Sequence, residues 1–167
     1  MKLVWVLLAT AVAVAVQTTI DRWIPDGAID LVLIVVVYNA LTTGRVSGLL
    51  AGTFAGLVQD ALSGGVIGMA GLSKTVVGYV TGILGTQFIV TGTLTRFVVF
   101  FLATVMNDVV FMGMYELLGL RSFGTPYAAV AAQGLGNAVV GVLAFKVVEL
   151  LPGAVERRRL ARSSFRR

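Results

Sequence analysis

A glycine at every fourth position, from residue 48 onward, is the feature that most constrains how this chain can fold. Gly48, Gly52 and Gly56 form this row, and Asp60 takes its next place. Because residues four apart share one face of a helix, the row predicts a helix with a flat stripe that ends in a charge. Such a stripe lets the backbone of a second helix approach closely, which is how helices commonly associate in lipid.

A second row with the same spacing follows a glycine-rich break. Its members are Lys74, Gly78 and Gly82. The two rows predict a pair of helices packed on their glycine faces, with the break as the turn between them. The break reads SGGVIGMA, and glycine tolerates the backbone angles that tight turns need. The turn glycines are Gly64, Gly65 and Gly68.

The composition places these helices in a membrane. The chain is 57% hydrophobic and 13% charged, and its mean hydropathy is +0.95. A soluble domain needs more polar surface than this composition supplies. The chain has no Cys and no His, which excludes thiol nucleophiles, cysteine zinc sites and histidine acid–base catalysis. We therefore expect an integral membrane protein without a metal, a cofactor or a catalytic residue.

The length of 167 residues allows about six spans, since one span needs about 20 apolar residues. We expect a six-transmembrane-helix bundle over residues 1–151, followed by a basic tail at 152–167. The first span has a basic start and the tripeptide Ala13-Val14-Ala15, so a cleaved signal peptide is the alternative to the retained span that we expect. The expected spans are 3–20, 28–41, 46–62, 71–90, 97–118 and 127–151.

The positive charge is concentrated in the tail. Six arginines against one glutamate account for the whole net charge of +5. By the positive-inside rule the tail is cytoplasmic, and six spans then put the N-terminus in the cytoplasm as well. We expect the tail to contact anionic lipid, with a dedicated partner site as the alternative, and we expect no nucleic acid. The arginines expected to make this contact are Arg157, Arg158, Arg159 and Arg162.

Polar groups inside the spans are candidates for contacts between helices. Asp60 and Lys74 lie at similar depth, so we expect them to face each other or to share a network, with snorkelling of Lys74 to the interface as the alternative. Asn107 and Asp108 interrupt the fifth span. On the sixth span, Gln133 and Asn137 fall in a row spaced by four. We expect these four to form a polar cluster with a structural role, and a proton or ion site is the alternative.

The sequence GLLAGTFAGLVQDALSGGVIGMAGLSKTVVGYVTG at residues 48–82 resembles the rod-shape-determining protein MreD family. The resemblance rests on the glycine-rich third span, on Asp60, on the glycine turn and on the start of the helix from Leu72 to Gly82. It is specific over about 35 residues and architectural elsewhere. It implies a fold similar to the S-component of energy-coupling-factor (ECF) transporters and a place in the bacterial cytoplasmic (inner) membrane.

The resemblance also implies a function and partners. It implies a non-enzymatic scaffold of the cell-elongation machinery that binds MreC and supports lateral peptidoglycan synthesis. Through this complex the chain would connect indirectly to RodA, to a class B penicillin-binding protein and to MreB. Small-residue rows left over after internal packing would form an intramembrane groove for the partner's helix, and the five row glycines are the expected contacts.

Two other functions compete with the scaffold. A small-molecule-binding subunit of a vitamin transporter would use Asp60, Lys74 and the glycine turn to line a pocket, although few side chains there suit ligand recognition. An intramembrane enzyme would need Asp60 and Asp108 as a catalytic pair, but they lie on different spans at unequal depth and neither is beside a nucleophile. We therefore expect no enzymatic activity.

Overall fold

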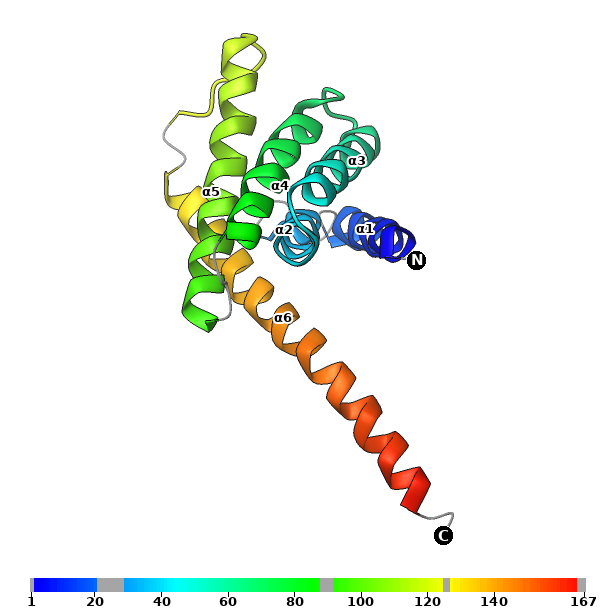
Figure 1. Ribbon diagram of the computed structural model, residues 1–167. Coiled ribbons are helices and arrows are strands. Elements are labelled where there is room, and N and C mark those ends of the chain that lie inside the picture. Colours follow the sequence, from blue (N-terminus) through cyan, green and yellow to red (C-terminus); the bar gives the residue numbers. More distant parts are fainter. Residues whose placement is uncertain (1, 21–28, 88–91, 125–126, 165–167) are drawn as a thin grey trace.

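The computed structural model describes residues 2–20, 29–87, 92–124 and 127–164, with side chains at 8–19, 29–87, 92–124 and 127–150. These residues form six α-helices and no strand (Figure 1). The expectation of an all-α fold with six helices is confirmed at this level. The helices are α1 (Lys2–Ile20), α2 (Leu31–Thr43), α3 (Arg45–Ser63), α4 (Met69–Gln87), α5 (Thr93–Leu117) and α6 (Tyr127–Ser164).

The predicted span limits are not tested by these helices, because a helix and a membrane span need not end together. Residues 21–27, between the first two expected spans, lie outside the described residues. The sequence predicts that the last span ends at Leu151, before Pro152 and Gly153, whereas α6 continues as a helix to Ser164. Its C-terminal half extends away from the other helices (Figure 1).

The closest helix contact in the fold is between α3 and α4, and glycines make it. A Cβ atom at Gly48 would overlap the backbone carbonyl of Gly78, and one at Gly52 would overlap the carbonyl of Lys74. Gly56 faces the backbone of Ala70 in the same way. The two backbones therefore touch along the row, as the spacing predicts. Thr53 and Thr75 add a hydrogen bond of 2.7 Å between their hydroxyl oxygens across this contact.

Helix α2 lies at the centre of the bundle and contacts each of the other five helices. It is rich in Val and Ile, and Val32, Leu33, Val36 and Val37 are almost completely buried. A helix that is apolar on all sides needs neighbours on all sides, which explains its central place. Helix α5 packs on α4 on one side and on α6 on the other.

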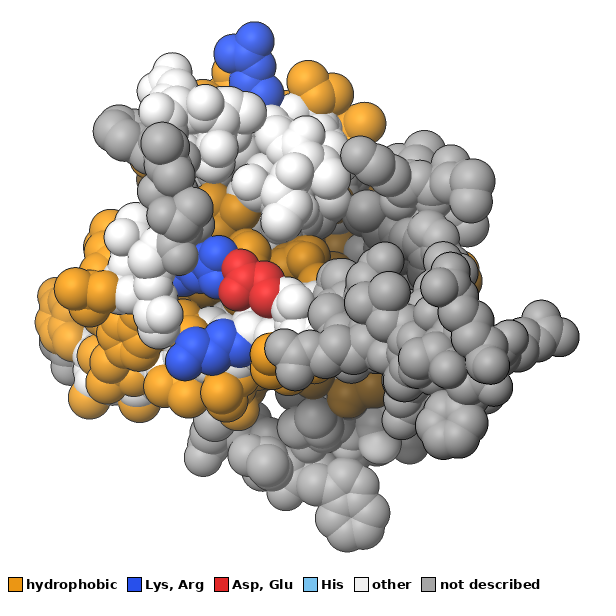
Figure 2. Space-filling model, turned by 60° about the horizontal axis from the view of Figure 1, so that its bottom comes forward, with side chains coloured by type: hydrophobic (Ala, Val, Ile, Leu, Met, Phe, Trp, Pro, Cys, Tyr) orange, Lys and Arg blue, Asp and Glu red, His pale blue; other side chains and the backbone are white. Residues whose placement is uncertain are grey.

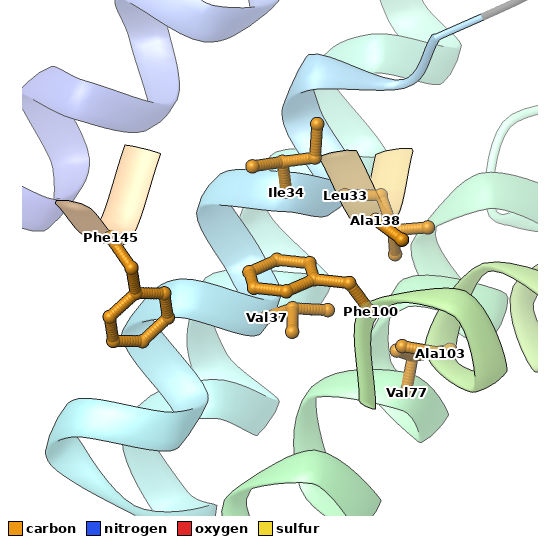
Figure 3. Close-up of a cluster of buried hydrophobic side chains, with 8 residues drawn as sticks. All are labelled: Leu33, Ile34, Val37, Val77, Phe100, Ala103, Ala138 and Phe145. Atoms are coloured by element: carbon orange, nitrogen blue, oxygen red, sulfur yellow. The ribbon is translucent and has the colours of Figure 1, made fainter. Parts of the chain in front are cut away.

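One hydrophobic cluster joins helices α2, α4, α5 and α6 (Figure 3). Phe100 from α5 is 1% exposed and lies beside Val37 from α2. Its ring meets the ring of Phe145 edge to face, with centroids 6.0 Å apart. Gly141 makes room for this ring, because a Cβ there would overlap Phe100. The cluster consists of Leu33, Ile34, Val37, Val77, Phe100, Ala103, Ala138 and Phe145.

The bundle buries polar side chains and exposes hydrophobic ones, as a protein surrounded by lipid must. Buried side chains include Lys74, Asp60 and Asn137, whereas large hydrophobic side chains such as Leu94 and Val109 are more than half exposed. Charged side chains cover only a small part of the described surface in Figure 2, which is otherwise hydrophobic or uncharged. A surface of this kind is stable against hydrocarbon and costly in water.

Two helices among the described residues are long and apolar enough to cross a membrane by themselves. They are α5, with a hydropathy of 2.0, and the Tyr127–Leu150 part of α6, with a hydropathy of 1.7. Helices α3 and α4 carry the glycine rows and buried polar residues, which lower their hydropathy. The finding supports a membrane protein, and the number of spans stays a prediction.

The contact between α3 and α4 predicts that Gly52→Ala destabilises the protein. The added Cβ overlaps a backbone carbonyl that cannot move aside, and overpacking of this kind costs about 1–3 kcal/mol. We expect a lower thermal unfolding midpoint in detergent. Gly113→Ala is the matched control, because a Cβ there meets nothing within 4 Å and alanine favours a helix. Equal midpoints for Gly52→Ala and the wild type would contradict the backbone contact.

Candidate functional site

Helix α2 begins deep inside the bundle, and this start organises the polar groups around it. Its first residue, Leu31, lies at the level of Asn137, which is ten residues into α6 and therefore about 15 Å from the beginning of that helix. The first N–H groups of a helix have no partner within the helix. In a membrane protein other protein groups must supply these partners.

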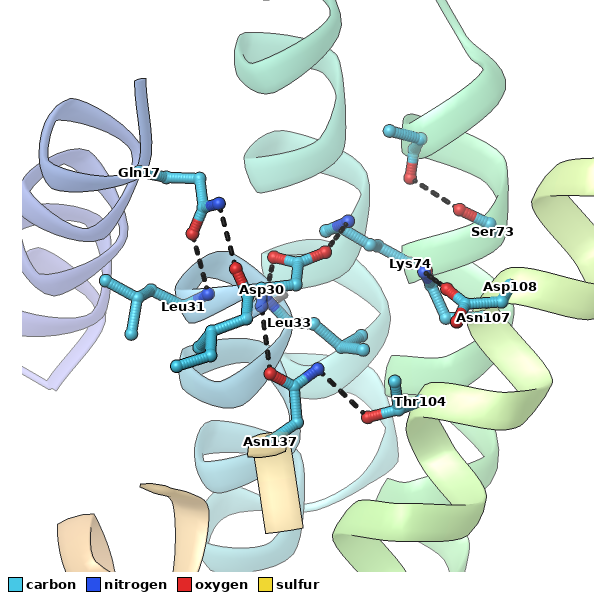
Figure 4. Close-up of polar contacts among 12 residues, drawn as sticks. Gln17, Asp30, Leu31, Leu33, Ser73, Lys74, Thr104, Asn107, Asp108 and Asn137 are labelled. Atoms are coloured by element: carbon cyan, nitrogen blue, oxygen red, sulfur yellow. Dashed lines mark hydrogen bonds and ion pairs between the residues drawn. The ribbon is translucent and has the colours of Figure 1, made fainter. Parts of the chain in front are cut away.

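Side chains from α1, from α6 and from the residue just before α2 supply them (Figure 4). The Asp30 carboxylate caps α2 by accepting a hydrogen bond of 2.8 Å from the N–H of Leu33. Gln17 of α1 accepts from the N–H of Leu31 at 2.9 Å and donates to the carbonyl of Ile29 at 2.9 Å. Asn137 of α6 accepts from the N–H of Asp30 at 2.9 Å. The start of α2 is therefore held by its own cap and by two neighbouring helices.

The charge of the cap is balanced by Lys74 of α4. Its Nζ lies 2.7 Å from Oδ2 of Asp30, and the two side chains are 3% and 9% exposed. A buried charge needs a partner of opposite sign, and each member of this pair supplies it for the other. Asn137 extends the network by donating a hydrogen bond of 3.1 Å to the Thr104 hydroxyl on α5. We call Gln17, Asp30, Lys74, Thr104 and Asn137 the α2 hub.

Asp60 contacts the backbone at the start of α4. Its carboxylate accepts hydrogen bonds from the backbone N–H groups of Gly68, Ala70 and Gly71, at 2.9 to 3.2 Å. These groups lie at the start of α4, where the helix dipole also favours a negative charge. Asp60 therefore ties the end of α3 to the start of α4. Lys74 pairs with Asp30, so of the two expected arrangements the direct pairing of Asp60 with Lys74 is not formed, and a shared network stays a prediction.

The turn between α3 and α4 uses two of the three predicted glycines in left-handed conformations. Gly64 ends α3 with a φ of 68°, and Gly68 has a φ of 106°. Residues with side chains rarely adopt these angles. The turn places the N–H of Gly68 within reach of Asp60.

Asn107 and Asp108 of α5 lie beside the α2 hub (Figure 4). The Asn107 amide donates to Oδ1 of Asp108 at 3.1 Å, and both residues are about 95% buried. A buried hydrogen bond between α5 and α6 is made by Thr104 and Asn137. The sequence predicts Asn137 in such a contact, but with Asn107 and Asp108 as its partners. Gln133 is half-buried and lines a cavity with them.

This cavity, which we call the polar pocket, has a volume of about 440 Å³. It lies between the α3–α4 turn and helices α5 and α6, and its floor includes Asp30 and Lys74 of the α2 hub. Cavities that bind small molecules commonly have volumes of this order. Its lining residues are Asp30, Gln59, Asp60, Ser63, Gly65, Ala70, Lys74, Asn107, Asp108, Phe111, Met112, Tyr115, Phe123 and Gln133.

A second hollow, which we call the apolar groove, lies on the flank of the bundle. Helices α1 and α6 each contact α2 and make no contact with each other among the described residues, so α2 forms the floor between them. The groove has a volume of about 570 Å³, and small side chains such as Ala9, Ala13 and Ala144 keep it open. Its lining residues are Leu8, Ala9, Val12, Ala13, Val16, Leu31, Ile34, Val35, Val140 and Ala144.

The remaining predicted site residues are placed as follows. Gly48, Gly52, Gly56, Gly78 and Gly82 all lie in the contact of α3 with its neighbours, where their Cβ atoms would overlap backbone. A role for them in binding a partner stays a prediction. Side chains of the arginine tail lie outside the described residues, so the predicted contact of Arg157, Arg158, Arg159 and Arg162 with lipid also stays a prediction.

Sequence reasoning did not single out three members of the α2 hub, namely Gln17, Asp30 and Thr104. A signal for Asp30 was present, because an aspartate directly before an apolar run is a typical helix N-cap. Gln17 is the first amide side chain in an otherwise apolar segment. Thr104 carries no signal, since threonines within helices usually bond to their own backbone, and its hydroxyl also donates to the Phe100 carbonyl at 2.9 Å.

Comparison with known proteins gives one family. The family described as rod shape-determining protein MreD matches residues 1–152, which covers all six helices except the end of α6. No curated protein and no solved structure matches the chain.

The ion pair of the α2 hub predicts a double-mutant result. Asp30→Asn keeps the cap of α2 but leaves Lys74 buried without a negative partner, and Lys74→Met leaves Asp30 without a positive one. Each single change should cost about 3–5 kcal/mol of stability, measured as thermal unfolding in detergent.

The double variant Asp30→Asn/Lys74→Met has no unpaired charge, so we expect it to be more stable than either single variant. Lys146→Met is the control, because Lys146 is exposed on α6. Additive losses in the double variant would mean that the two side chains are not coupled.

Proposed function

We propose that this chain, which belongs to the MreD family of rod shape-determining proteins, acts in rod shape determination as a non-enzymatic membrane scaffold. The scaffold would bind the transmembrane helix of a partner protein in the apolar groove. The observation that carries this proposal is the groove itself, which has an apolar floor and two apolar walls made by separate helices.

The groove suits an apolar helix better than the glycine rows do. The rows of α3 and α4 are already covered by each other, so a partner could reach them only by separating the two helices. In the groove, Leu8, Val12 and Val16 are exposed at helical spacing along α1. Without water to drive association, helices in lipid pair through close packing of small and branched side chains. A helix seated there would contact α1, α2 and α6 together.

The partner that the family resemblance implies is MreC, which crosses the membrane once. Binding MreC would link this chain indirectly to RodA, to a class B penicillin-binding protein and to MreB, and so to lateral peptidoglycan synthesis. A bundle whose described surface carries many exposed hydrophobic side chains suits such a role, because it presents surfaces within the membrane.

The membrane would be the bacterial cytoplasmic (inner) membrane, with six spans and both termini in the cytoplasm. The arginine-rich tail supports this orientation by the positive-inside rule, and Arg157, Arg158, Arg159 and Arg162 would contact anionic lipid. The long helix α6 would carry this tail out of the membrane, since 38 residues of helix extend about 57 Å and the hydrocarbon core is about 30 Å thick.

A second candidate function is a small-molecule-binding subunit with a fold similar to the S-component of ECF transporters. The polar pocket favours it, because the cavity combines buried polar groups with aromatic side chains. A rise in the thermal unfolding midpoint with a vitamin-like compound would support this function.

The groove predicts that Ala144→Phe weakens partner binding. Ala144 is half-buried on the α6 wall, and a phenyl ring there fills the space that a partner helix would occupy. We expect at least about a tenfold loss of MreC in co-purification from membranes in mild detergent, because a filled interface loses close packing. Ala132→Phe is the control, since Ala132 is exposed on the same helix and does not line the groove. Undiminished MreC with Ala144→Phe would exclude the groove as the binding surface.

A further inference from the structure

The polar pocket contains hydrogen-bond acceptors that the protein leaves unused. Among the described residues, Oδ1 of Asn107, Oδ2 of Asp108 and Oε1 of Gln59 are buried and have no hydrogen-bond partner. Asn107 is 5% exposed and Asp108 is 6% exposed. All three side chains line the pocket. Buried polar atoms are nearly always paired, so three unpaired oxygens at one cavity indicate that something else supplies their donors.

The charges around the pocket show which kind of donor is missing. The pocket is lined by three carboxylates and one lysine. Asp30 is paired with Lys74, and Asp60 is held by three backbone N–H groups. Among the described residues, Asp108 accepts a hydrogen bond only from the Asn107 amide and forms no salt bridge. Lys74 lines the same pocket but is paired with Asp30. A buried carboxylate without a salt-bridge partner is costly, so the pocket suits a ligand that brings one further positive charge.

Aromatic side chains also line the pocket. The rings of Phe111 and Tyr115 are 4.9 Å apart, and those of Tyr115 and Phe123 are 6.0 Å apart. Together they provide an apolar wall next to the acceptors, because Phe111 and Tyr115 follow Asn107 at intervals of four on α5. Ring faces also attract cations. A ligand for this pocket would carry positive charge at one end and apolar surface at the other.

We propose that the polar pocket binds a small organic amine. Its protonated amino group donates hydrogen bonds to Asn107, Asp108 and Gln59, and its apolar body packs against Phe111 and Tyr115. A protonated primary amine has three donors and one positive charge, which matches the three free acceptors and the missing charge. This inference uses the same pocket as the second candidate function, and it does not require that the protein takes part in transport.

The test measures binding of phenethylamine to the purified full-length protein in detergent, by thermal unfolding and by titration calorimetry. We expect phenethylamine to raise the unfolding midpoint and to bind the Asp108→Asn variant about tenfold or more weakly, because its ammonium group then bonds to a neutral acceptor instead of a carboxylate. Glu116→Gln is the matched control, since Glu116 is an exposed carboxylate on the same helix, and binding to it should equal that of the wild type.

Two comparison ligands separate the amine from simpler occupants. Phenethyl alcohol has the same ring without the charge, and ammonium chloride supplies the cation without the ring. Both should bind at least about tenfold more weakly than phenethylamine. Equal binding of phenethyl alcohol would show that only the apolar wall matters, and equal binding of ammonium would show an inorganic cation site. Either result, or no binding of phenethylamine, overturns the proposal.

A second variant protects the test against a folding defect. If Asp108→Asn has a lower midpoint without ligand, Gln59→Leu is used, because it removes one acceptor from a half-buried position on α3. It should weaken phenethylamine binding about threefold or more. Unchanged binding in a folded Gln59→Leu variant also counts against the site. None of these variants touches the apolar groove, so partner binding at the groove succeeds or fails independently of this result.

Discussion

The hydrogen bonds at the first turn of α2 are the constraint on which the rest of this bundle depends. A helix that begins inside a membrane protein must find partners for its free N–H groups within the protein. Gln17, Asp30 and Asn137 provide them, and each comes from a different part of the chain. Because the cap is a buried carboxylate, a cation is needed to balance its charge. Lys74 supplies this cation and so holds α4 beside the start of α2. The position of one helix start therefore fixes the register of α1, α4 and α6 around α2.

The two hollows of the molecule follow from this arrangement. Helix α2 lies at the centre, and its start is tied to α4. Helices α1 and α6 each contact α2 but not each other among the described residues, so the apolar groove remains between them. On the other side of the hub, the polar pocket lies between the α3–α4 turn and α5. One side of the hub is lined by aliphatic side chains and the other by carboxylates, amides and aromatic rings. The proposals for a partner helix and for a small amine follow from this difference in lining.

The parts of the fold that could be predicted from the sequence are the local ones. A row such as Gly48, Gly52 and Gly56 depends only on helical spacing, and the glycine turn follows from backbone sterics. The contacts of Lys74 could not be predicted, because its choice between Asp30 and Asp60 depends on how deep α2 begins. Depth counted from predicted span ends placed Asp60 nearest, but Asp60 is already satisfied by the backbone of α4. The apolar groove could not be predicted either, since it arises from two helices that do not touch.

The contact between α3 and α4 has a mechanical consequence. Where Gly52 meets the carbonyl of Lys74, no side chain separates the backbones, so no rotamer can adjust to absorb a displacement. A packed interface of this kind is either closed or open and does not deform by degrees. Helices α3 and α4 must then move together as one rigid body.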